Sequence, residues 1–151
     1  MNEQTVETQF GTLVLTEKAG AISQVRWGRA NSESSSDLLN KAALQLREYD
    51  TGTREVFELP LHVKGSDFQR AVCDQIYAIP FGETVTYGEI AKRLGARPQA
   101  VGGACGANPI PIIIPCHRGM GAKGLTGFSG AGGIETKVEL LRHEKAGGFL
   151  I

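Results

Sequence analysis

The chain has 151 residues, and its 16 Lys and Arg balance its 16 Asp and Glu to a formal net charge of zero. This length allows one ordinary domain or two small lobes that share a core, and 41% of the residues are hydrophobic, enough for a packed interior. No run of about 18 apolar residues is present, which argues against a membrane span. The first residues have neither a basic start nor an apolar stretch, so we expect no secretory signal.

The cysteines are odd in number, and their spacing contains no CxxC pair. They are Cys73, Cys105 and Cys116. This pattern argues against a disulfide framework and against a zinc knuckle, and it favours a reducing cytoplasm.

Charge is divided unevenly along the chain. Residues 1–60 hold six Lys and Arg against nine Asp and Glu, whereas residues 61–151 hold ten against seven. An anionic partner would therefore meet the C-terminal part, although a solvated surface of mixed charge gives the same counts.

Residues 1–60 are expected to form short strands followed by one helix. Residues 12–16 and 22–27 alternate partly between apolar and polar side chains, which favours strands. A helix over residues 37–49 follows, because apolar residues recur on one face. These residues are Leu38, Ala42, Leu46 and Tyr49. We find no His pair, carboxylate cluster or phosphate-binding loop here, so this lobe is expected to be a scaffold.

The C-terminal part begins with two signals for the start of a helix. Ser66 and Gln69 fit a capping box, in which both side chains satisfy backbone N–H groups that the helix leaves unpaired. The helix that follows is expected to bury one stripe, consisting of Phe68, Val72, Ile76 and Ile79. A second capping box, Thr86 with Glu89, begins a short helix over Tyr87–Leu94 that Gly95 ends.

A third helix over residues 98–107 starts with a proline, which the first helical turn tolerates. Two short helices joined by a Gly-containing turn favour a helix-turn-helix, with a helical hairpin that only packs as the alternative. The third helix is uncharged and contains Gly102 and Gly103. Each interior glycine costs a helix about 1 kcal/mol, so another backbone or a nucleic-acid groove is expected to approach closely.

An apolar, strand-like run over residues 110–114 leads to the pair Cys116 and His117. A cysteine reacts as its thiolate, so a nucleophilic cysteine needs a base or a positive field nearby. His117 can supply the base, although adjacent side chains often point apart. Cys73 and Cys105 fit the alternative role of small core residues on helical stripes.

The string Ile-Pro-Cys-His-Arg at residues 114–118 resembles the active-site signature of the O6-alkylguanine-DNA alkyltransferases. Further motifs occur in that family's order and spacing over roughly residues 66–145. They are FGETVTYGEIA at 81–91, AVGGA at 100–104, Asn108-Pro109, GFSG at 127–130 and LLRHE at 140–144.

The resemblance implies an α/β (α+β) fold in two parts. Residues 1–60 would form a small strand-and-helix, RNase H-like lobe, and residues 61–151 a winged helix-turn-helix-like domain that carries the active site. The implied activity is DNA repair by direct reversal, in which the alkyl group of O6-alkylguanine moves irreversibly to the protein. The enzyme would be a methylated-DNA–[protein]-cysteine S-methyltransferase that acts once.

The resemblance also implies roles for the catalytic residues. Cys116 would accept the alkyl group, and His117 would act as its base through a water, oriented by Glu144. Asn108 would brace the cysteine loop by hydrogen bonds, because a buried loop needs its backbone groups satisfied.

Further residues would bind DNA and the base flipped out of it. Tyr87 would help rotate the base and then hydrogen-bond it, and the backbone around Ser129 would donate to O6. The helix over residues 98–107 would enter the minor groove. The substrate-binding residues implied are Tyr87, Gln99, Ala100, Gly102, Gly119, Phe128 and Ser129.

The chain departs from the family pattern at several of these positions. Gln99 replaces an arginine that fills the gap left by the flipped base, and Gly119 and Met120 replace branched apolar residues. Phe128 stands where tyrosine is common. Cysteine ligands for the zinc site of some relatives are missing, so we expect no metal and no cofactor.

The implied partner is double-stranded DNA containing O6-alkylguanine, bound by a monomer or by several molecules side by side. The protein would be cytoplasmic and associated with the nucleoid when bound to DNA. Two other classes stay open. One is a non-catalytic module that binds alkylated DNA, which the presence of Cys116 disfavours. The other is a Cys-His hydrolase or thiol-redox enzyme, which the absence of a nearby resolving cysteine disfavours.

Overall fold

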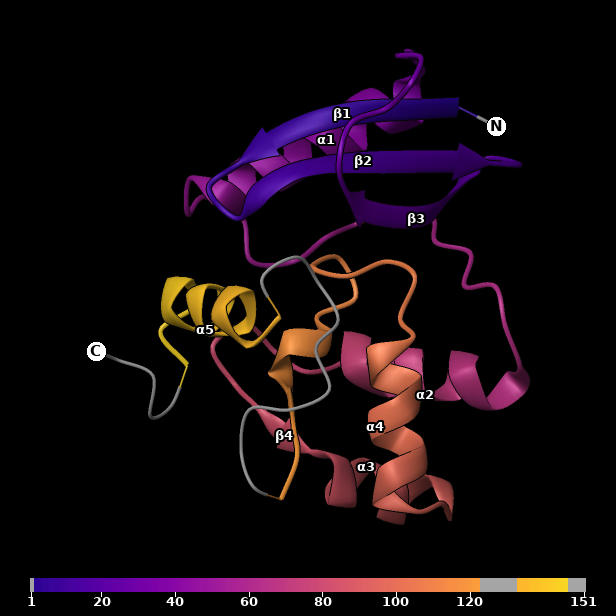
Figure 1. The fold of residues 1–151 in the computed structure, drawn as a ribbon, viewed down its shortest axis with the longest axis vertical. Coiled ribbons are helices and arrows are strands. Elements are labelled where there is room, and N and C mark those ends of the chain that lie inside the picture. The colour runs from indigo at the N-terminus through magenta and orange to yellow at the C-terminus, as the bar shows by residue number, and fades with distance from the viewer. Residues whose placement is uncertain (1, 123–132, 147–151) are drawn as a thin grey trace.

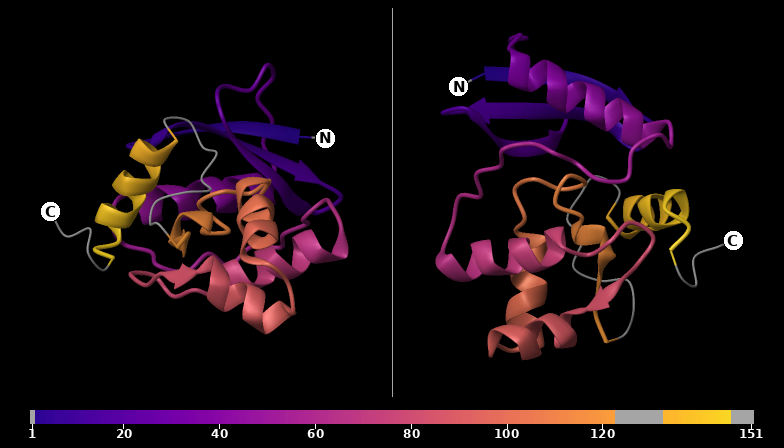
Figure 2. Two further views of the ribbon diagram at one scale, coloured as in Figure 1. Left: turned by 60° about the horizontal axis from the view of Figure 1, so that its bottom comes forward. Right: turned by 180° about the vertical axis from the view of Figure 1, so that it is seen from behind.

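The computed structural model of the chain describes residues 2–122 and 133–146. It has a sheet covered by one helix at one end and a helical part at the other (Figure 1). The sheet contains β1 (Asn2–Thr8), β2 (Gly11–Lys18) and β3 (Ala21–Trp27) in the order β1-β2-β3, and both pairs are antiparallel. α1 (Asp37–Asp50) crosses one face of this sheet (Figure 2).

β2, β3 and α1 confirm the three elements expected in residues 1–60, whereas β1 was not predicted. In β1 only Val6 is fully buried, so this strand lacks the alternation that identifies a strand in a sequence. On α1 the buried face includes Ala42, Leu46 and Tyr49 as expected, but Leu39 is fully buried and Leu38 only partly.

The helical part carries the remaining elements. They are α2 (Asp67–Tyr77), β4 (Val85–Thr86), α3 (Tyr87–Leu94), α4 (Pro98–Gly106), the 3₁₀ turn η1 (Cys116–Arg118), β5 (Gly119–Met120) and α5 (Ile134–His143). β4 and β5 pair in parallel. α3 packs against α4 in the expected helix-turn-helix, and Gly95 ends α3 in the left-handed conformation at φ 65°. The mixed α/β fold and the helix-turn-helix within it are thereby confirmed.

One of the two capping boxes is complete. Glu89 N donates to the Thr86 hydroxyl at 3.1 Å, and Thr86 N donates to the Glu89 carboxylate at 3.3 Å. At α2 the Ser66 hydroxyl accepts from Gln69 N, but the Gln69 amide donates to Ala104 O at 2.7 Å. The prediction for Gln69 was wrong because its side chain ties α2 to α4.

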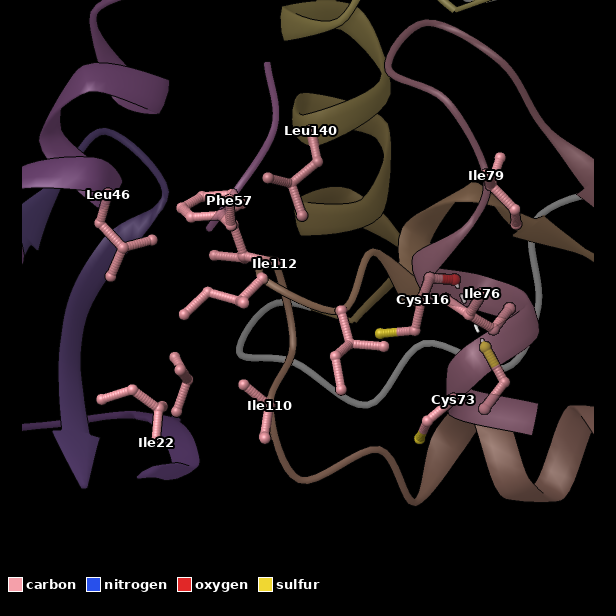
Figure 3. Close-up of a cluster of buried hydrophobic side chains, with 14 of the residues drawn as sticks. Ile22, Leu46, Phe57, Cys73, Ile76, Ile79, Ile110, Ile112, Cys116 and Leu140 are labelled. Carbon is pink, nitrogen blue, oxygen red and sulfur yellow. Dashed lines mark hydrogen bonds between the residues drawn. The ribbon is translucent and has the colours of Figure 1, made fainter. Parts of the chain in front are cut away.

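The two parts of the fold share one core. Ile22, Leu46 and Phe57, from the first 60 residues, lie in one buried cluster with Ile110 and Ile112 (Figure 3). Backbone hydrogen bonds also cross the junction, since His62 N donates to Ile22 O at 2.9 Å and Val25 N donates to Pro109 O at 2.9 Å. No helix in residues 2–122 and 133–146 is long and apolar enough to cross a membrane.

Candidate active site

Residues 110–114 form a tight turn, where the sequence predicts a strand-like run. Ile114 N donates to Ile110 O at 2.9 Å, and Ile112 lies in the left-handed region at φ 71°. Pro111 and Pro115 have no amide hydrogen for a strand ladder, which explains the difference. The turn is buried and places Cys116 at the start of η1.

Asn108 holds this turn from one side. Its amide donates to Ile114 O at 2.8 Å, and its carbonyl oxygen accepts from Ile110 N at 2.9 Å. The Asn108 side chain also lowers the pKa of the Cys116 thiol, against the larger effects of Cys105 and burial, which raise it. Asn108 therefore satisfies backbone groups at both ends of the turn that leads to the candidate nucleophile.

His117 and Glu144 form a buried pair beside Cys116. Nε2 of His117 lies 2.7 Å from Oε2 of Glu144, and both side chains are fully buried. Burial raises the pKa of Glu144, but hydrogen bonds and charges from His117 and Arg118 outweigh it and hold this pKa well below its ordinary value. Burial also lowers the pKa of His117, despite the neighbouring carboxylate.

With Glu144 ionised and His117 neutral, the tautomer of the imidazole can be assigned. The Glu144 carboxylate can only accept, so Nε2 of His117 carries the ring proton and Nδ1 keeps a lone pair. Nδ1 is the single buried side-chain nitrogen or oxygen without a hydrogen-bond partner in the described parts of the chain. His117 is therefore a neutral base with its lone pair uncommitted.

Two residues without a predicted role complete the environment of Glu144. Arg118 donates from Nε to Oε1 at 2.8 Å and from Nη2 to Oε2 at 3.0 Å, which makes a bidentate ion pair. Tyr49, on α1, donates its hydroxyl to Oε2 at 2.6 Å. The sequence indicated a scaffold role for residues 1–60, but Tyr49 brings that lobe into the site.

Cys116 is only 3% exposed, and a second cysteine lies against it. Cys105 Sγ donates to Cys116 O at 3.4 Å. The contact with Cys105, together with burial, raises the pKa of Cys116 well above its ordinary value. Cys105 is a core residue, as expected, but it also lies against Cys116, so the expectation that no second cysteine lies near the candidate nucleophile was wrong.

The ring of Tyr87 lies between two glycines, Gly102 and Gly119, near Cys105. A Cβ added to Gly119 would lie 2.8 Å from Cε1 of Tyr87, and one added to Gly102 would lie 3.2 Å from Cδ2. Both glycines therefore make room for the ring, and a Cβ added to Gly103 would meet nothing within 4 Å. Lys137, fully buried on α5, lies over the ring at 5.9 Å and donates from Nζ to Gly119 O at 2.6 Å.

A pocket of about 540 Å³ opens beside Tyr87 on the surface of α3 and α4. It is lined by Thr86, Tyr87, Gly88, Pro98, Gln99, Gly102 and Ala122. Gln99 and Ala100 are exposed in the first turn of α4. The structure thus gathers Tyr87, Gln99 and Gly102 at one pocket, with Ala100 beside it and Gly119 behind the tyrosine ring.

The predicted residues Phe128 and Ser129 lie outside the described residues. The sequence did not predict a role in the site for four residues, which are Tyr49, Cys105, Arg118 and Lys137. Arg118 alone could have been found, because it belongs to the signature string at residues 114–118. A buried lysine such as Lys137 cannot be distinguished from a surface lysine in the sequence.

The sequence profile described as "6-O-methylguanine DNA methyltransferase, DNA binding domain" matches residues 67–146. The chain is 39% identical to the methylated-DNA–protein-cysteine methyltransferase of Mycobacterium bovis, over 95% of this chain and 92% of that protein. The enzyme of the same name from Shigella flexneri is 45% identical over 71% of this chain and 62% of its own length. The crystal structure of Mycobacterium tuberculosis OGT in complex with DNA is similar with a TM-score of 0.84 and 36% identity, covering 99% of this chain and 98% of that one.

Proposed function

The chain belongs to the 6-O-methylguanine DNA methyltransferase family, and from that premise we propose that it repairs alkylated DNA by direct reversal. Cys116 accepts the alkyl group from guanine O6, once per molecule. The observation that carries this proposal is the buried pair of His117 and Glu144, joined at 2.7 Å directly beside the cysteine. It combines a nucleophile, a base and a group that orients the base.

The transfer is a displacement at the alkyl carbon. His117 Nδ1 takes the thiol proton of Cys116 through a water, and the imidazolium that forms faces the Glu144 carboxylate. The sulfur–carbon bond forms as the carbon–O6 bond breaks, and the electron pair goes to the guanine. The guanine then takes up a proton. The product is a thioether, and among residues 2–122 and 133–146 no group beside Cys116 is suited to hydrolyse it, so each molecule is proposed to react once.

Tyr87 and Ser129 are proposed to hold the base. A Cβ added to Gly119 would lie 2.8 Å from Cε1 of Tyr87 and 3.5 Å from Sγ of Cys105, so the ring lies near the cysteine that contacts Cys116. Burial is the main cause that raises the pKa of Tyr87, which keeps the hydroxyl protonated as a donor. A flipped base would meet this donor, with backbone N–H groups near Ser129 donating to O6. Phe128 would line the same pocket.

DNA is proposed to lie along α3 and α4. Gln99, Ala100 and Gly103 are exposed on α4, so its small residues allow a close approach of the minor-groove walls. Lys92, Arg93 and Arg97 are exposed around the turn between the helices, where they can meet phosphates. The pocket beside Tyr87 is lined by the first turns of α3 and α4 and would accept the flipped base.

Three coarser features complete the proposal. We place the boundary between the scaffold lobe and the DNA-binding, alkyl-transfer domain at residue 60. The protein binds double-stranded DNA with O6-alkylguanine as a monomer, and several molecules can bind side by side. It works in the cytoplasm on nucleoid DNA, where its three free cysteines stay reduced.

The test is the intact mass of the protein after incubation with duplex DNA that contains one O6-methylguanine. We expect the protein to gain one methyl group, located on the peptide that contains Cys116, and the same duplex without the lesion to change nothing. Retained binding without a mass change would support a lesion-binding module instead. Repeated turnover without a mass change would support a hydrolase.

A further inference from the structure

Gly119 stands in β5 at a position whose backbone does not require glycine. Its φ of −87° and ψ of 133° suit any residue. It pairs with Val85, and its carbonyl oxygen accepts from Nζ of Lys137 at 2.6 Å, so two contacts fix this backbone. Since the family usually has a branched apolar residue here, the reason for a glycine is the space that a side chain would occupy.

The ring of Tyr87 fills this space. A Cβ added to Gly119 would lie 2.8 Å from Cε1 of Tyr87 and 3.3 Å from Cδ1 of Ile76, whereas packed carbon atoms lie about 3.5–4.0 Å apart. At the other edge of the ring, a Cβ added to Gly102 would lie 3.2 Å from Cδ2 and 3.3 Å from Cε2. The space between the two glycines, here termed the tyrosine slot, therefore fits the ring because both side chains are absent.

The tyrosine slot lies next to the cysteine that contacts the acceptor. A Cβ added to Gly119 would also lie 3.5 Å from Sγ of Cys105, and this sulfur donates to Cys116 O at 3.4 Å. The ring in the slot is buried, with only 6% of Tyr87 exposed. The ammonium of Lys137 lies 5.9 Å from the ring centroid, within the range of a cation–π attraction. This attraction and the close packing hold the ring in the slot.

Tyr87 also lines the pocket of about 540 Å³ that opens on α3 and α4. Gly102 lines this pocket too, but Cys116 is not among the described residues that do so. The acceptor is instead only 3% exposed. A molecule in the pocket therefore contacts Tyr87 and does not reach the thiol of Cys116.

We propose that the tyrosine slot holds the ring of Tyr87 as a closed gate between this pocket and the thiol of Cys116. The proposal rests on the proposed function, in which Cys116 is the acceptor and a flipped base enters the pocket. The ring leaves the slot as the base enters, and the same residue then meets the base. Until that moment the closed gate shields the thiol from small electrophiles, which would otherwise inactivate an acceptor that reacts once.

The experiment measures how fast iodoacetamide modifies Cys116 in the protein without DNA, with each modified cysteine identified by peptide mass spectrometry. A buried thiol reacts in proportion to the fraction of molecules in which it is accessible. In Gly119→Ala the added Cβ overpacks the slot and disfavours the closed gate, so this rate should rise about tenfold. Gly102→Ala makes a smaller overlap and should give a smaller rise. Gly103→Ala is the matched control, because its Cβ would meet nothing within 4 Å, and it should react like the unmodified protein.

Two comparisons separate opening of the gate from a general loosening of the fold. Cys73 is also 3% exposed but lines a different pocket, so its modification rate should not change in Gly119→Ala. In Tyr87→Ala, Cys116 should react faster, and adding Gly119→Ala should raise its rate no further, because Cε1 is gone. Thermal unfolding identifies the variants that are folded at the assay temperature. If Tyr87→Ala is not among them, Tyr87→Leu replaces it, since leucine also lacks an atom at Cε1.

Three outcomes would overturn the inference. They are an unchanged rate at Cys116 in Gly119→Ala, an equal rise at Cys116 and Cys73, and a rise that persists when the ring of Tyr87 is absent. Methyl transfer from O6-methylguanine DNA to the unmodified protein is measured in parallel. If no methyl group is transferred, the proposed function fails, and the iodoacetamide rates still decide whether the ring covers Cys116. If it is transferred and the iodoacetamide rates do not change, only the gate fails.

Discussion

The hydroxyl of Tyr49 donates to Oε2 of Glu144 at 2.6 Å, which joins α1 to a carboxylate 95 residues further along the chain. Burial raises the pKa of Tyr49 well above its ordinary value, as does the charge of Glu144, so the hydroxyl keeps its proton and donates. The backbone oxygen of Tyr49 also lies 2.7 Å from Nε2 of His143, at the end of α5. The N-terminal lobe therefore fixes the residue that orients His117.

This contact predicts the effect of Tyr49→Phe, which removes the hydroxyl and keeps the ring. Hydrogen bonds to charged groups contribute about 1.5–3 kcal/mol, so the free energy of unfolding should fall by about that amount. Methyl transfer under single-turnover conditions should slow by up to about tenfold, equivalent to about 1.4 kcal/mol, because Glu144 loses one of its fixed donors.

Tyr77→Phe is the matched control. The Tyr77 hydroxyl also donates to a protein oxygen, the carbonyl of Phe57, but lies outside the site. This variant should lose stability without a change in transfer rate. If Tyr49→Phe transfers at the full rate, the N-terminal lobe is a scaffold only.

Replacing the acceptor gives the second prediction. Cys116→Ala and Cys116→Ser should abolish methyl transfer, because a hydroxyl is far weaker than a thiolate as a nucleophile at neutral pH. The fold and the affinity for DNA should remain, as circular dichroism and a gel-shift assay would show. A methyl group found on Cys105 or Cys73 would disprove the assignment of Cys116.

The third prediction is that His117 and Glu144 act as one unit. His117→Gln or Glu144→Gln should each slow transfer by about 100- to 10,000-fold, and the double variant should be little slower than either one. Rapid-quench measurement of a single turnover provides the rates. The exposed His62 offers a control, His62→Gln, which should react normally. Strictly additive effects would show that the two residues act separately.

Much of this fold could be predicted from local patterns. Thr86 with Glu89 and the following Gly95 define α3 to the residue, because capping and the left-handed end depend on neighbours in the chain. β1 could not be predicted, since Val6 is its one fully buried residue and its pairing with β2 comes from the tertiary structure.

The site residues likewise include some that local sequence patterns identify and some that they do not. Cys116 and His117 stand in one string and were identified together, and Glu144 came from a family motif. Tyr49 was correctly assigned to the buried face of α1, but no local pattern indicates that its hydroxyl reaches Glu144. Lys137 was missed because its amphipathic helix gives no sign that the ammonium turns inward to Gly119 O.

The fourth prediction concerns the stability of the protein against acid. The folded-state pKa values of His117 and Glu144 lie below their ordinary values of 6.5 and 4.5. The unfolded chain therefore binds protons first as the pH falls, so stability should be highest above about pH 6.5 and decrease below it. A second decrease should begin near pH 4.5, as Glu144 of the unfolded chain becomes protonated. Urea unfolding between pH 4 and 8 measures both decreases in the free energy of unfolding. In His117→Gln the first decrease, below about pH 6.5, should become smaller.

Gln99 gives the last prediction, because it stands where the family usually has an arginine. It is exposed in the first turn of α4 and lines the pocket beside Tyr87. From this place an arginine could stack in the gap left by the flipped base, pair with the orphaned base and add a positive charge near phosphates. Glutamine keeps the hydrogen bonds but lacks the charge. We therefore expect base flipping to limit the rate on duplex DNA.

Gln99→Arg should tighten duplex binding and speed repair in duplex DNA, while the reaction with the free O6-methylguanine base stays unchanged, because that base needs no flipping. The salt dependence of duplex affinity should steepen by about one unit of slope for the added phosphate contact. Gln99→Met is the control, because methionine is long like arginine but carries no charge. It should not steepen the salt dependence of duplex affinity. If Gln99→Arg slows duplex repair, or speeds both reactions equally, glutamine is already an adequate replacement for the flipped base, and flipping does not limit the rate.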